Sequence, residues 1–195
     1  MSRYSRIVIG LSFSILMVLV AAGFFLRHLV RKSFPVTDGT LHVTGLHADV
    51  DVYRDRDGVP HIRAQDDHDL MVAAGYVQAQ DRLWQMDLMR RAGEGRLSEI
   101  LGTPTVDLDL LFRTLDLRGL AGRIRDQLHP GSREILEAYA EGVNDFIRSH
   151  EGKYPIEFDM LDYKPEPWKI EHSIIIGRVM AWELDRKSTR LNSSH

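Results

Sequence analysis

The sequence contains no cysteine in its 195 residues. Without thiols, the chain cannot form a disulfide framework, a thiolate metal site or a thiol redox centre. Acidic residues are missing from the first 34 residues, where five basic residues lie. Residues 35–195 therefore hold 20 Lys and Arg against 28 Asp and Glu, a net charge of −8. A nucleic-acid partner is disfavoured, because phosphate binding needs clustered basic side chains.

Charge of either sign is missing from residues 7–26, an apolar run of 20 residues. At about 1.5 Å of rise per residue, a helix of this length spans about 30 Å, the thickness of a bilayer core. The apolar region of a cleaved signal peptide is shorter, and the small residues Ala21-Ala22-Gly23 form a poor cleavage site. We predict an uncleaved signal anchor, a transmembrane helix, within residues 1–34, with a cleaved signal peptide as the alternative. Basic residues flank both ends of the run, so they leave its orientation open.

Motifs of several well-known enzyme sites are also missing. Gly93-Glu94-Gly95 lacks the third glycine and the preceding strand of a phosphate-binding loop, and no serine lies in a Gly-x-Ser-x-Gly elbow. None of the nine histidines forms the four-residue pairing of a helical zinc site with a Glu between, so no metal ligand is predicted. We interpret Asp66, Asp67 and Asp69 as the solvated start of a helix rather than a carboxylate cluster.

The segments that remain predict an α+β body that is mostly helical. Alternating residues around the Asp57-Gly58 turn predict a β-hairpin over 49–64. Apolar residues at helical spacing predict helices over about 66–95, 106–128, 132–147 and 171–180. In the second of these the pattern is stopped by Pro130, and Ser132 is expected to cap the third.

One stretch of unusual composition, residues 79–102, places many charges inside an amphipathic frame. Helical spacing brings Asp87 close to Arg90 and Arg91, one turn away. Such charges form either a solvated surface of weak salt bridges or a partly buried ionic network that holds this helix against a catalytic domain. The residues alone leave both interpretations open.

The chain resembles the penicillin acylase family of N-terminal-nucleophile hydrolases. The resemblance covers residues from about 40 to 184 and is most specific at 76–102. The matching segments are RDRDGVPHIRAQDDHDL (54–70), AAGYVQAQDRLWQMDLMRRAGEGRLSEILG (73–102), EAYAEGVNDFI (137–147) and PEPWKIEHSIIIGRVMAWEL (165–184).

The resemblance implies a precursor that cleaves itself into a small N-terminal chain and a large C-terminal chain, its partner. The full fold implied is a four-layer αββα sandwich, of which this chain is an N-terminal fragment. The large chain starts with a serine whose own α-amino group acts as base, and the enzyme hydrolyses an N-acyl amide bond. The Ser-Asn start of that chain does not occur here, since the two asparagines follow Val143 and Leu191. No catalytic residue is therefore expected in this chain.

The resemblance also suggests where the acyl group binds. Met180 matches a pocket position of the family, and Leu184 replaces an aromatic residue found in penicillin-type members. This leaves the acyl group open between an arylacetyl group, a glutaryl-like group and the aliphatic chain of an acyl-homoserine lactone, so the substrate is of the penicillin, cephalosporin or acyl-homoserine lactone type. Ordinary core packing of Met180 and Leu184 is the alternative. Calcium is possible in the full-length enzyme, with carboxylate ligands downstream of residue 184. The body is expected to be periplasmic or otherwise extracytoplasmic.

The last residues, 185–195 (DRKSTRLNSSH), abandon the helical pattern and match what a common sequencing-adaptor oligonucleotide encodes in one frame. We interpret them as an artefactual tail behind an incomplete small-chain region, residues 35–184. The alternative function is a single-pass membrane protein whose extracytoplasmic helical module binds a partner.

Overall fold

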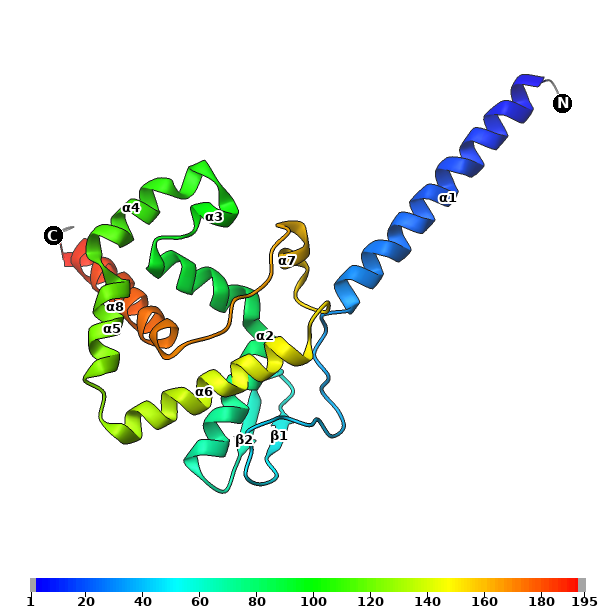
Figure 1. Ribbon diagram of the computed structural model, residues 1–195. Coiled ribbons are helices and arrows are strands. Elements are labelled where there is room, and N and C mark those ends of the chain that lie inside the picture. Colours follow the sequence, from blue (N-terminus) through cyan, green and yellow to red (C-terminus); the bar gives the residue numbers. More distant parts are fainter. Residues whose placement is uncertain (1–2, 193–195) are drawn as a thin grey trace.

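The computed structural model of the chain describes residues 3–192 (Figure 1). The side chains of residues 3, 5–11, 26, 28–30 and 186–192 lie outside the described set. The described chain is mostly helical with one two-stranded sheet, as the sequence predicts. Its elements are α1 (Arg3–Arg31), β1 (Asp51–Arg54), β2 (Pro60–Arg63), α2 (Asp67–Glu94), α3 (Ser98–Leu101), the 3-10 helix η1 (Thr103–Thr105), α4 (Val106–Leu115), α5 (Leu117–Asp126), α6 (Pro130–Ser149), α7 (Ile156–Met160) and α8 (Ile170–Asn192).

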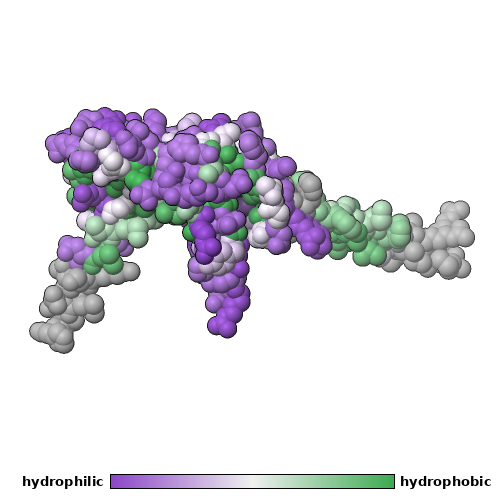
Figure 2. All heavy atoms as spheres, turned by 90° about the horizontal axis from the view of Figure 1, so that it is seen from below, coloured by the Kyte–Doolittle hydropathy of each residue, from purple (hydrophilic) through white to green (hydrophobic). Residues whose placement is uncertain are grey.

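Helix α1 extends away from the rest of the molecule (Figure 1). Its described side chains over 12–25 are exposed, and they give the green arm at the right of Figure 2. Among the residues that the structure describes, no helix is both long enough and apolar enough to cross a membrane. The signal anchor predicted over 7–26 is thus not supported by the structure, and the side chains of 7–11 and 26 lie outside the described set.

The predicted hairpin is confirmed, with β1 and β2 antiparallel and Val52 opposite Ile62. Its turn is held by Asp55, whose Oδ1 accepts hydrogen bonds from the backbone N–H groups of Asp57 at 2.9 Å and Val59 at 3.0 Å. At the other end, the Arg54 guanidinium donates two 2.8 Å hydrogen bonds to the Asp81 carboxylate of α2. This bidentate pair fixes the small sheet to the long helix.

The centre of the body is the crossing of α2 and α6, where two glycines let the helix backbones touch. A Cβ on Gly142 would lie 1.9 Å from the carbonyl oxygen of Val72, and a Cβ on Gly75 would lie 2.1 Å from that of Tyr139. Any larger residue would force the helices apart. Around this crossing lies the main hydrophobic core, formed by Tyr76, Ala79, Leu83, Met86, Ala140, Val143, Phe146, Ile147, Tyr154, Phe158 and Trp168.

A second hydrophobic core holds α8 against α4 and α5. Ile175 and Val179 of α8 are buried against Phe112, Leu117 and Ala121. Close approach is again made possible by a glycine, since a Cβ on Gly93 of α2 would lie 2.2 Å from Cγ2 of Ile175. Helix α8 is therefore seated on both α2 and the α4–α5 pair.

The structure corrects the prediction of one helix over 106–128, because the chain breaks at Asp116 into α4 and α5. Asp116 adopts a left-handed backbone conformation with φ of 49°, and its Oδ1 accepts a 3.0 Å hydrogen bond from the N–H of Gly119. Aspartate tolerates this conformation better than most residues, and here it ends one helix and caps the next. The apolar spacing continues across the break, so periodicity alone does not reveal it.

Two helix ends also differ from the prediction. Helix α6 begins at Pro130 with His129 as its cap, not at Ser132, because proline is well suited to the first helical position, where its missing N–H costs nothing. Helix α8 continues to Asn192, past the predicted end near Met180 and into the segment interpreted as a tail. The origin of that segment, and the division of the chain at residues 34 and 184, stay predictions.

Candidate functional site

The two predicted substrate-binding residues, Met180 and Leu184, lie one turn apart on α8. Met180 is 55% exposed and Leu184 is 66% exposed. Core packing within this chain is therefore not their role. Both are apolar groups on a helix whose opposite face, with Ile175 and Val179, is buried in the second core. Their role in substrate binding stays a prediction.

A buried ionic network lies at the C-terminal end of α2 and is centred on Asp87. Its Oδ1 accepts a 2.8 Å hydrogen bond from Nε of Arg90, and its Oδ2 accepts bonds at 2.9 Å from Nε of Arg91 and from the hydroxyl of Tyr163. Arg90 is fully buried and Asp87 is 2% exposed. The structure thus favours a partly buried network over a solvated surface for residues 79–102, and the network holds α2 against another segment of this chain. We call it the Asp87 network, consisting of Asp87, Arg90, Arg91, Arg96, Glu99 and Glu166.

Glu166 joins this network from the segment that precedes α8. Its carboxylate accepts hydrogen bonds from Arg90 at 3.2 Å, Arg91 at 3.2 Å and Arg96 at 2.7 Å. These guanidinium groups, Arg96 above all, lower the pKa of Glu166 to about 2. The carboxylate is therefore charged at neutral pH and fixes the entry to α8 onto the end of α2.

Neighbouring groups respond to the same charges. Burial and the positive charge of Arg90 lower the pKa of His172 to about 3, so this buried imidazole is neutral at physiological pH. Burial and the adjacent Asp87 raise the pKa of Tyr163. The phenol therefore stays protonated and donates a hydrogen bond to the Asp87 carboxylate. Among the described residues, no buried side-chain nitrogen or oxygen lacks a hydrogen-bond partner. A network satisfied in this way rigidifies its surroundings.

Further contacts complete the placement of α8. The amide of Asn144 on α6 donates to the carbonyl of Trp168 at 2.9 Å and accepts from its N–H at 2.6 Å. Arg125 of α5 forms an ion pair with Glu171 in the first turn of α8. The partners of the Asp87 network and of these bonds all lie within this chain. Their combined effect is to position the helix that carries Met180 and Leu184.

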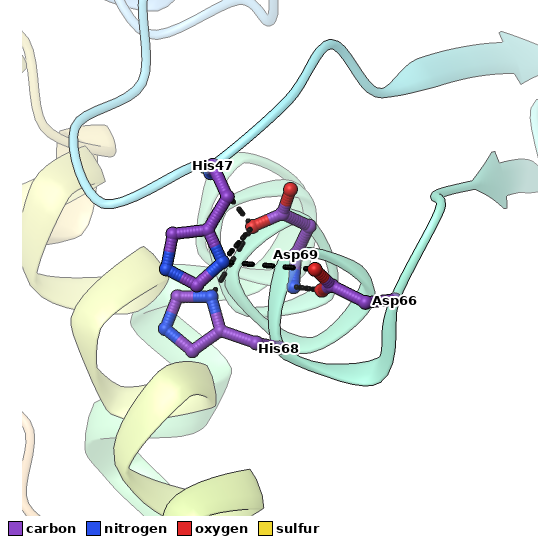
Figure 3. Close-up of side chains that lie close together, drawn as sticks. All are labelled: His47, Asp66, His68 and Asp69. Atoms are coloured by element: carbon purple, nitrogen blue, oxygen red, sulfur yellow. Dashed lines mark hydrogen bonds and ion pairs between the residues drawn. The ribbon is translucent and has the colours of Figure 1, made fainter.

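A second polar cluster, which the sequence interpretation missed, lies at the N-terminal end of α2 (Figure 3). It consists of His47, Asp66, His68 and Asp69, and one potential ligand atom of each residue lies within 4.8 Å of those of the others. Asp69 is fully buried, which corrects its interpretation as part of a solvated helix start. Its Oδ1 and Oδ2 each accept a 2.9 Å hydrogen bond, from the N–H groups of His47 and Ala48. These bonds lower the pKa of Asp69, although burial opposes them.

The cluster does not suit the calcium expected for the full-length enzyme. Calcium takes oxygen ligands, whereas two of the four groups here are imidazoles. The spacing of Asp66, His68 and Asp69 is visible in the sequence as a local signal. The contribution of His47 is not, because a loop of irregular structure brings it there from 19 residues upstream of Asp66.

Comparison with known proteins identifies the family. The sequence profile described as penicillin amidase matches residues 49–194. The chain belongs to the penicillin amidase family. The prediction made from the sequence motifs is thus confirmed, and the Asp87 network and all of α8 lie inside the matched region.

Relatives in the penicillin amidase family include two kinds of acylase. The chain is 40% identical over 152 residues to the penicillin acylase 2 proenzyme of Pseudomonas sp. (strain SE83), which covers 78% of this chain and 20% of the relative. It is 36% identical over 146 residues to the acyl-homoserine lactone acylase QuiP of Pseudomonas fluorescens, which covers 75% of this chain and 18% of the relative. The chain thus spans about a fifth of the length of these curated relatives.

A solved structure from the penicillin amidase family supports the fold. The thermostable penicillin G acylase from Alcaligenes faecalis superposes with a TM-score of 0.59 and 32% sequence identity. The superposition covers 66% of this chain and 69% of that chain. The likeness therefore extends over most of both chains.

Proposed function

We propose that this chain is the N-terminal part of a precursor amidohydrolase that hydrolyses an N-acyl amide bond of a penicillin, a cephalosporin or an acyl-homoserine lactone. The proposal rests on the family match over residues 49–194. It also rests on the length of the match, since this chain aligns with only 20% of the length of a relative named as a proenzyme. The nucleophile, an N-terminal serine, belongs to a larger chain that follows. The 195 residues alone are inactive.

Two features of the structure support a large partner chain. The solved penicillin G acylase chain is matched over 69% of its own length, against 20% for the proenzyme, as expected where relatives mature into a short chain and a long one. Helix α4 also carries exposed apolar residues on one face, Leu108, Leu111 and Leu115, each 37–41% exposed. We assign this face, together with the exposed side of α8, to contact with the large chain, which completes the αββα sandwich.

The chemistry proposed for the large chain is nucleophilic catalysis without a separate base residue. An α-amino group has a pKa of about 7.7–8.0, so a substantial fraction is free base near neutral pH and can take the proton of the serine hydroxyl beside it. The serine oxygen then attacks the amide carbonyl, the C–N bond breaks, and the amine leaves with the proton held by the α-amino group. Water hydrolyses the acyl-enzyme ester, which releases the acid and restores the serine, and hydrogen-bond donors around the carbonyl oxygen stabilise the tetrahedral intermediates. This chain contributes the acyl pocket rather than the reacting groups.

The proposed acyl pocket includes Met180 and Leu184 of α8. Their exposure in this chain leaves both side chains free to contact a substrate held between the two chains. Leucine in place of an aromatic residue favours an aliphatic acyl chain, because a flexible branched side chain does not stack on an aryl ring.

The test is expression of the complete reading frame that continues beyond codon 184 of the genomic gene. We expect cleavage of the precursor into two chains, a new N-terminal serine identified by mass spectrometry, and hydrolysis of phenylacetyl amides, glutaryl amides or acyl-homoserine lactones. The 195-residue chain expressed alone is the control and should match a heat-killed sample. Turnover by the chain alone would overturn the placement of the nucleophile. A genuine stop codon after residue 195 with no Ser-Asn region downstream would favour a membrane-bound binding module instead.

A variant of the full precursor tests the acyl pocket. Leu184→Phe should shift the ratio of kcat/KM values towards phenylacetyl and away from aliphatic substrates, by about tenfold or more, since one altered pocket contact contributes about 1–3 kcal/mol to discrimination. Met160→Phe, at the exposed end of α7, is the control and should leave the ratio unchanged. If the unchanged enzyme and both variants showed the same ratio of kcat/KM values, Leu184 would not line the acyl pocket.

The location of the protein is also a proposal and rests on the sequence. Residues 7–26 would anchor the chain in the membrane with the body on the periplasmic side. Fractionation of cells into membrane and soluble material, followed by protease treatment of spheroplasts, tests both points. Release of the full-length chain into the soluble fraction would contradict the anchor.

A further inference from the structure

The polar cluster at the start of α2 is separate from the Asp87 network and from the proposed acyl pocket. It joins a loop residue, His47, to the cap of α2, Asp66, and to two residues of its first turn, His68 and Asp69. Figure 3 shows the four side chains converging from these two segments. We propose that His47, Asp66, His68 and Asp69 bind one zinc ion that clamps the loop to the helix.

The distances between the polar atoms support a four-ligand site. Nδ1 of His47 lies 3.6 Å from Oδ2 of Asp66 and 3.6 Å from Oδ1 of Asp69. Nδ1 of His68 lies 3.2 Å from the same Oδ1. Ligands about 2.1 Å from a tetrahedral zinc ion are separated from each other by about 3.4 Å. Three edges of the required tetrahedron are thus present already within a few tenths of an ångström.

The two carboxylates are held in place by the backbone before any metal arrives. Asp69 accepts hydrogen bonds from the backbone N–H groups of residues 47 and 48, and its Oδ1 also forms a 3.2 Å hydrogen bond with Nδ1 of His68. Asp66 uses only Oδ1 to cap the N–H of Asp69 at 2.8 Å. A carboxylate oxygen has two lone pairs. At Oδ1 of Asp69 the zinc ion would take the place of the His68 contact, and Oδ2 of Asp66 can accept it directly. Oriented ligands of this kind raise metal affinity.

The donor set favours zinc over the alkaline-earth ions. Two imidazole nitrogens and two carboxylate oxygens suit zinc, whereas calcium and magnesium prefer oxygen ligands alone. The two carboxylates also balance the charge of a divalent ion when both histidines are neutral. Access from solvent is open, because the side chains of His47 and Asp66 are 64% and 50% exposed.

Zinc binding requires one rearrangement. The two imidazole rings are stacked, with centroids 4.2 Å apart and planes inclined by 16°. Because a metal ion lies in the plane of an imidazole that binds it, the rings must turn until both planes meet at the ion. His47 lies on an exposed loop and has room to turn, while Asp69, fully buried, stays fixed.

The effect of the ion would be structural. The loop from residue 33 to 50 contacts the body through Asp69, through hydrogen bonds from Thr44 to Asp145 of α6 and from Gln80 to the carbonyl of Val36, and through Val43, which packs on the main core. A zinc ion shared between His47 and the first turn of α2 adds a strong cross-link between segments about 20 residues apart. Metal binding would therefore stabilise the folded state over the unfolded one.

The test is zinc titration of the full 195-residue chain in competition with a chromophoric chelator. The chain is purified in mild detergent with an affinity tag that contains no His or Cys. We expect one zinc ion per chain, a raised midpoint of thermal unfolding with zinc but not with magnesium, and an X-ray absorption spectrum showing two imidazole nitrogens. Loss of a residue that only hydrogen-bonds to a metal ligand typically lowers metal affinity by about tenfold or more. Loss of a ligand itself should cost at least as much, so His47→Ala and His68→Ala should each lower the zinc affinity at least about tenfold.

His61→Ala is the matched control, since this histidine is also partly exposed and paired with an aspartate but lies on β2. It should bind zinc like the unchanged chain. His47→Ala and His68→Ala both keep the backbone N–H of residue 47, which donates a hydrogen bond to Asp69. Circular dichroism should therefore show an unchanged helical content in both. The absence of saturable zinc binding, equal affinity in all three variants, or displacement of zinc by an equal concentration of calcium would overturn the proposal.

Discussion

Arg90 has no exposed surface, and its guanidinium is compensated by Asp87 and Glu166 rather than by water. Its charge acts on the buried imidazole of His172 next to it, which accepts a 3.0 Å hydrogen bond from the N–H of Lys169 through Nδ1. Single residues in this region are therefore coupled by charge as well as by packing. A change in the protonation of one of them therefore changes the free energy of unfolding.

The pH dependence of stability follows from His172. Its pKa is about 3 in the folded chain against 6.5 for an ordinary histidine, so the unfolded chain takes up a proton first as the pH falls. The stabilisation is fully present above pH 6.5 and is lost as the pH falls from there towards 3, by up to about 1.4 kcal/mol per pH unit. Chemical denaturation at several pH values measures this slope.

His172→Gln should reduce this slope between about pH 6.5 and 5, whatever its effect on stability at neutral pH. Part of the slope should remain, because burial also lowers the pKa of His150. His61→Gln, which removes an exposed histidine, should retain the slope of the unchanged chain. An equal slope in all three proteins would mean that His172 is not the group responsible.

Among the secondary-structure elements, the pairing of α2 with α6 depends on two backbone contacts that only glycine allows. The sequence predicts both helices from the spacing of their apolar residues, and it predicts the hairpin from Asp57-Gly58. It does not predict the break at Asp116, because that depends on one backbone conformation that several residues tolerate. Nor does it predict which glycines lie at a crossing, because that depends on the angle between helices.

A substitution at the crossing tests this contact. In Gly142→Ala the new Cβ would lie 1.9 Å from the carbonyl oxygen of Val72, so the helices must separate. We expect a loss of about 1–3 kcal/mol in the free energy of unfolding, the usual cost of overpacking a core. Gly122→Ala in α5 is the control, because its Cβ meets nothing within 4 Å.

The control should stabilise the chain by about 0.5–1 kcal/mol, since alanine is the better helix former. Urea denaturation of both variants measures the difference. A neutral or stabilising Gly142→Ala would show that the two helices are not in contact at this point.

For the molecule as a whole, large apolar side chains are exposed on α1, α4 and α8. The sequence pattern predicts the amphipathic faces, but it cannot say which of them remains uncovered. The sequence pattern also does not predict the partners of the Asp87 network. Glu166 lies 79 residues from Asp87, and only the fold brings the two into one network. Local contacts were accessible from the sequence and distant ones were not.

Self-association of the isolated chain is the expected outcome. Residues 35–184 expressed alone should bind a hydrophobic dye and elute from size exclusion as an oligomer. Replacing Leu108 and Leu111 on α4 with Glu should increase the monomer fraction. The same replacements at the buried positions Phe112 and Ala121 should unfold the chain instead. If the unchanged residues 35–184 were monomeric, the exposed apolar face of α4 would not be a surface that requires a partner.

The α2–α6 crossing also affects how the protein is made. Every residue of that crossing has left the ribosome once residue 149 and the stretch that fills the exit tunnel have been synthesised. Domains fold as units during synthesis, at about 5–20 residues per second. The contact of α2 with α6 at Gly75 and Gly142 can therefore form while α8 is still inside the exit tunnel, and Trp168 and α8 are added to this pair afterwards.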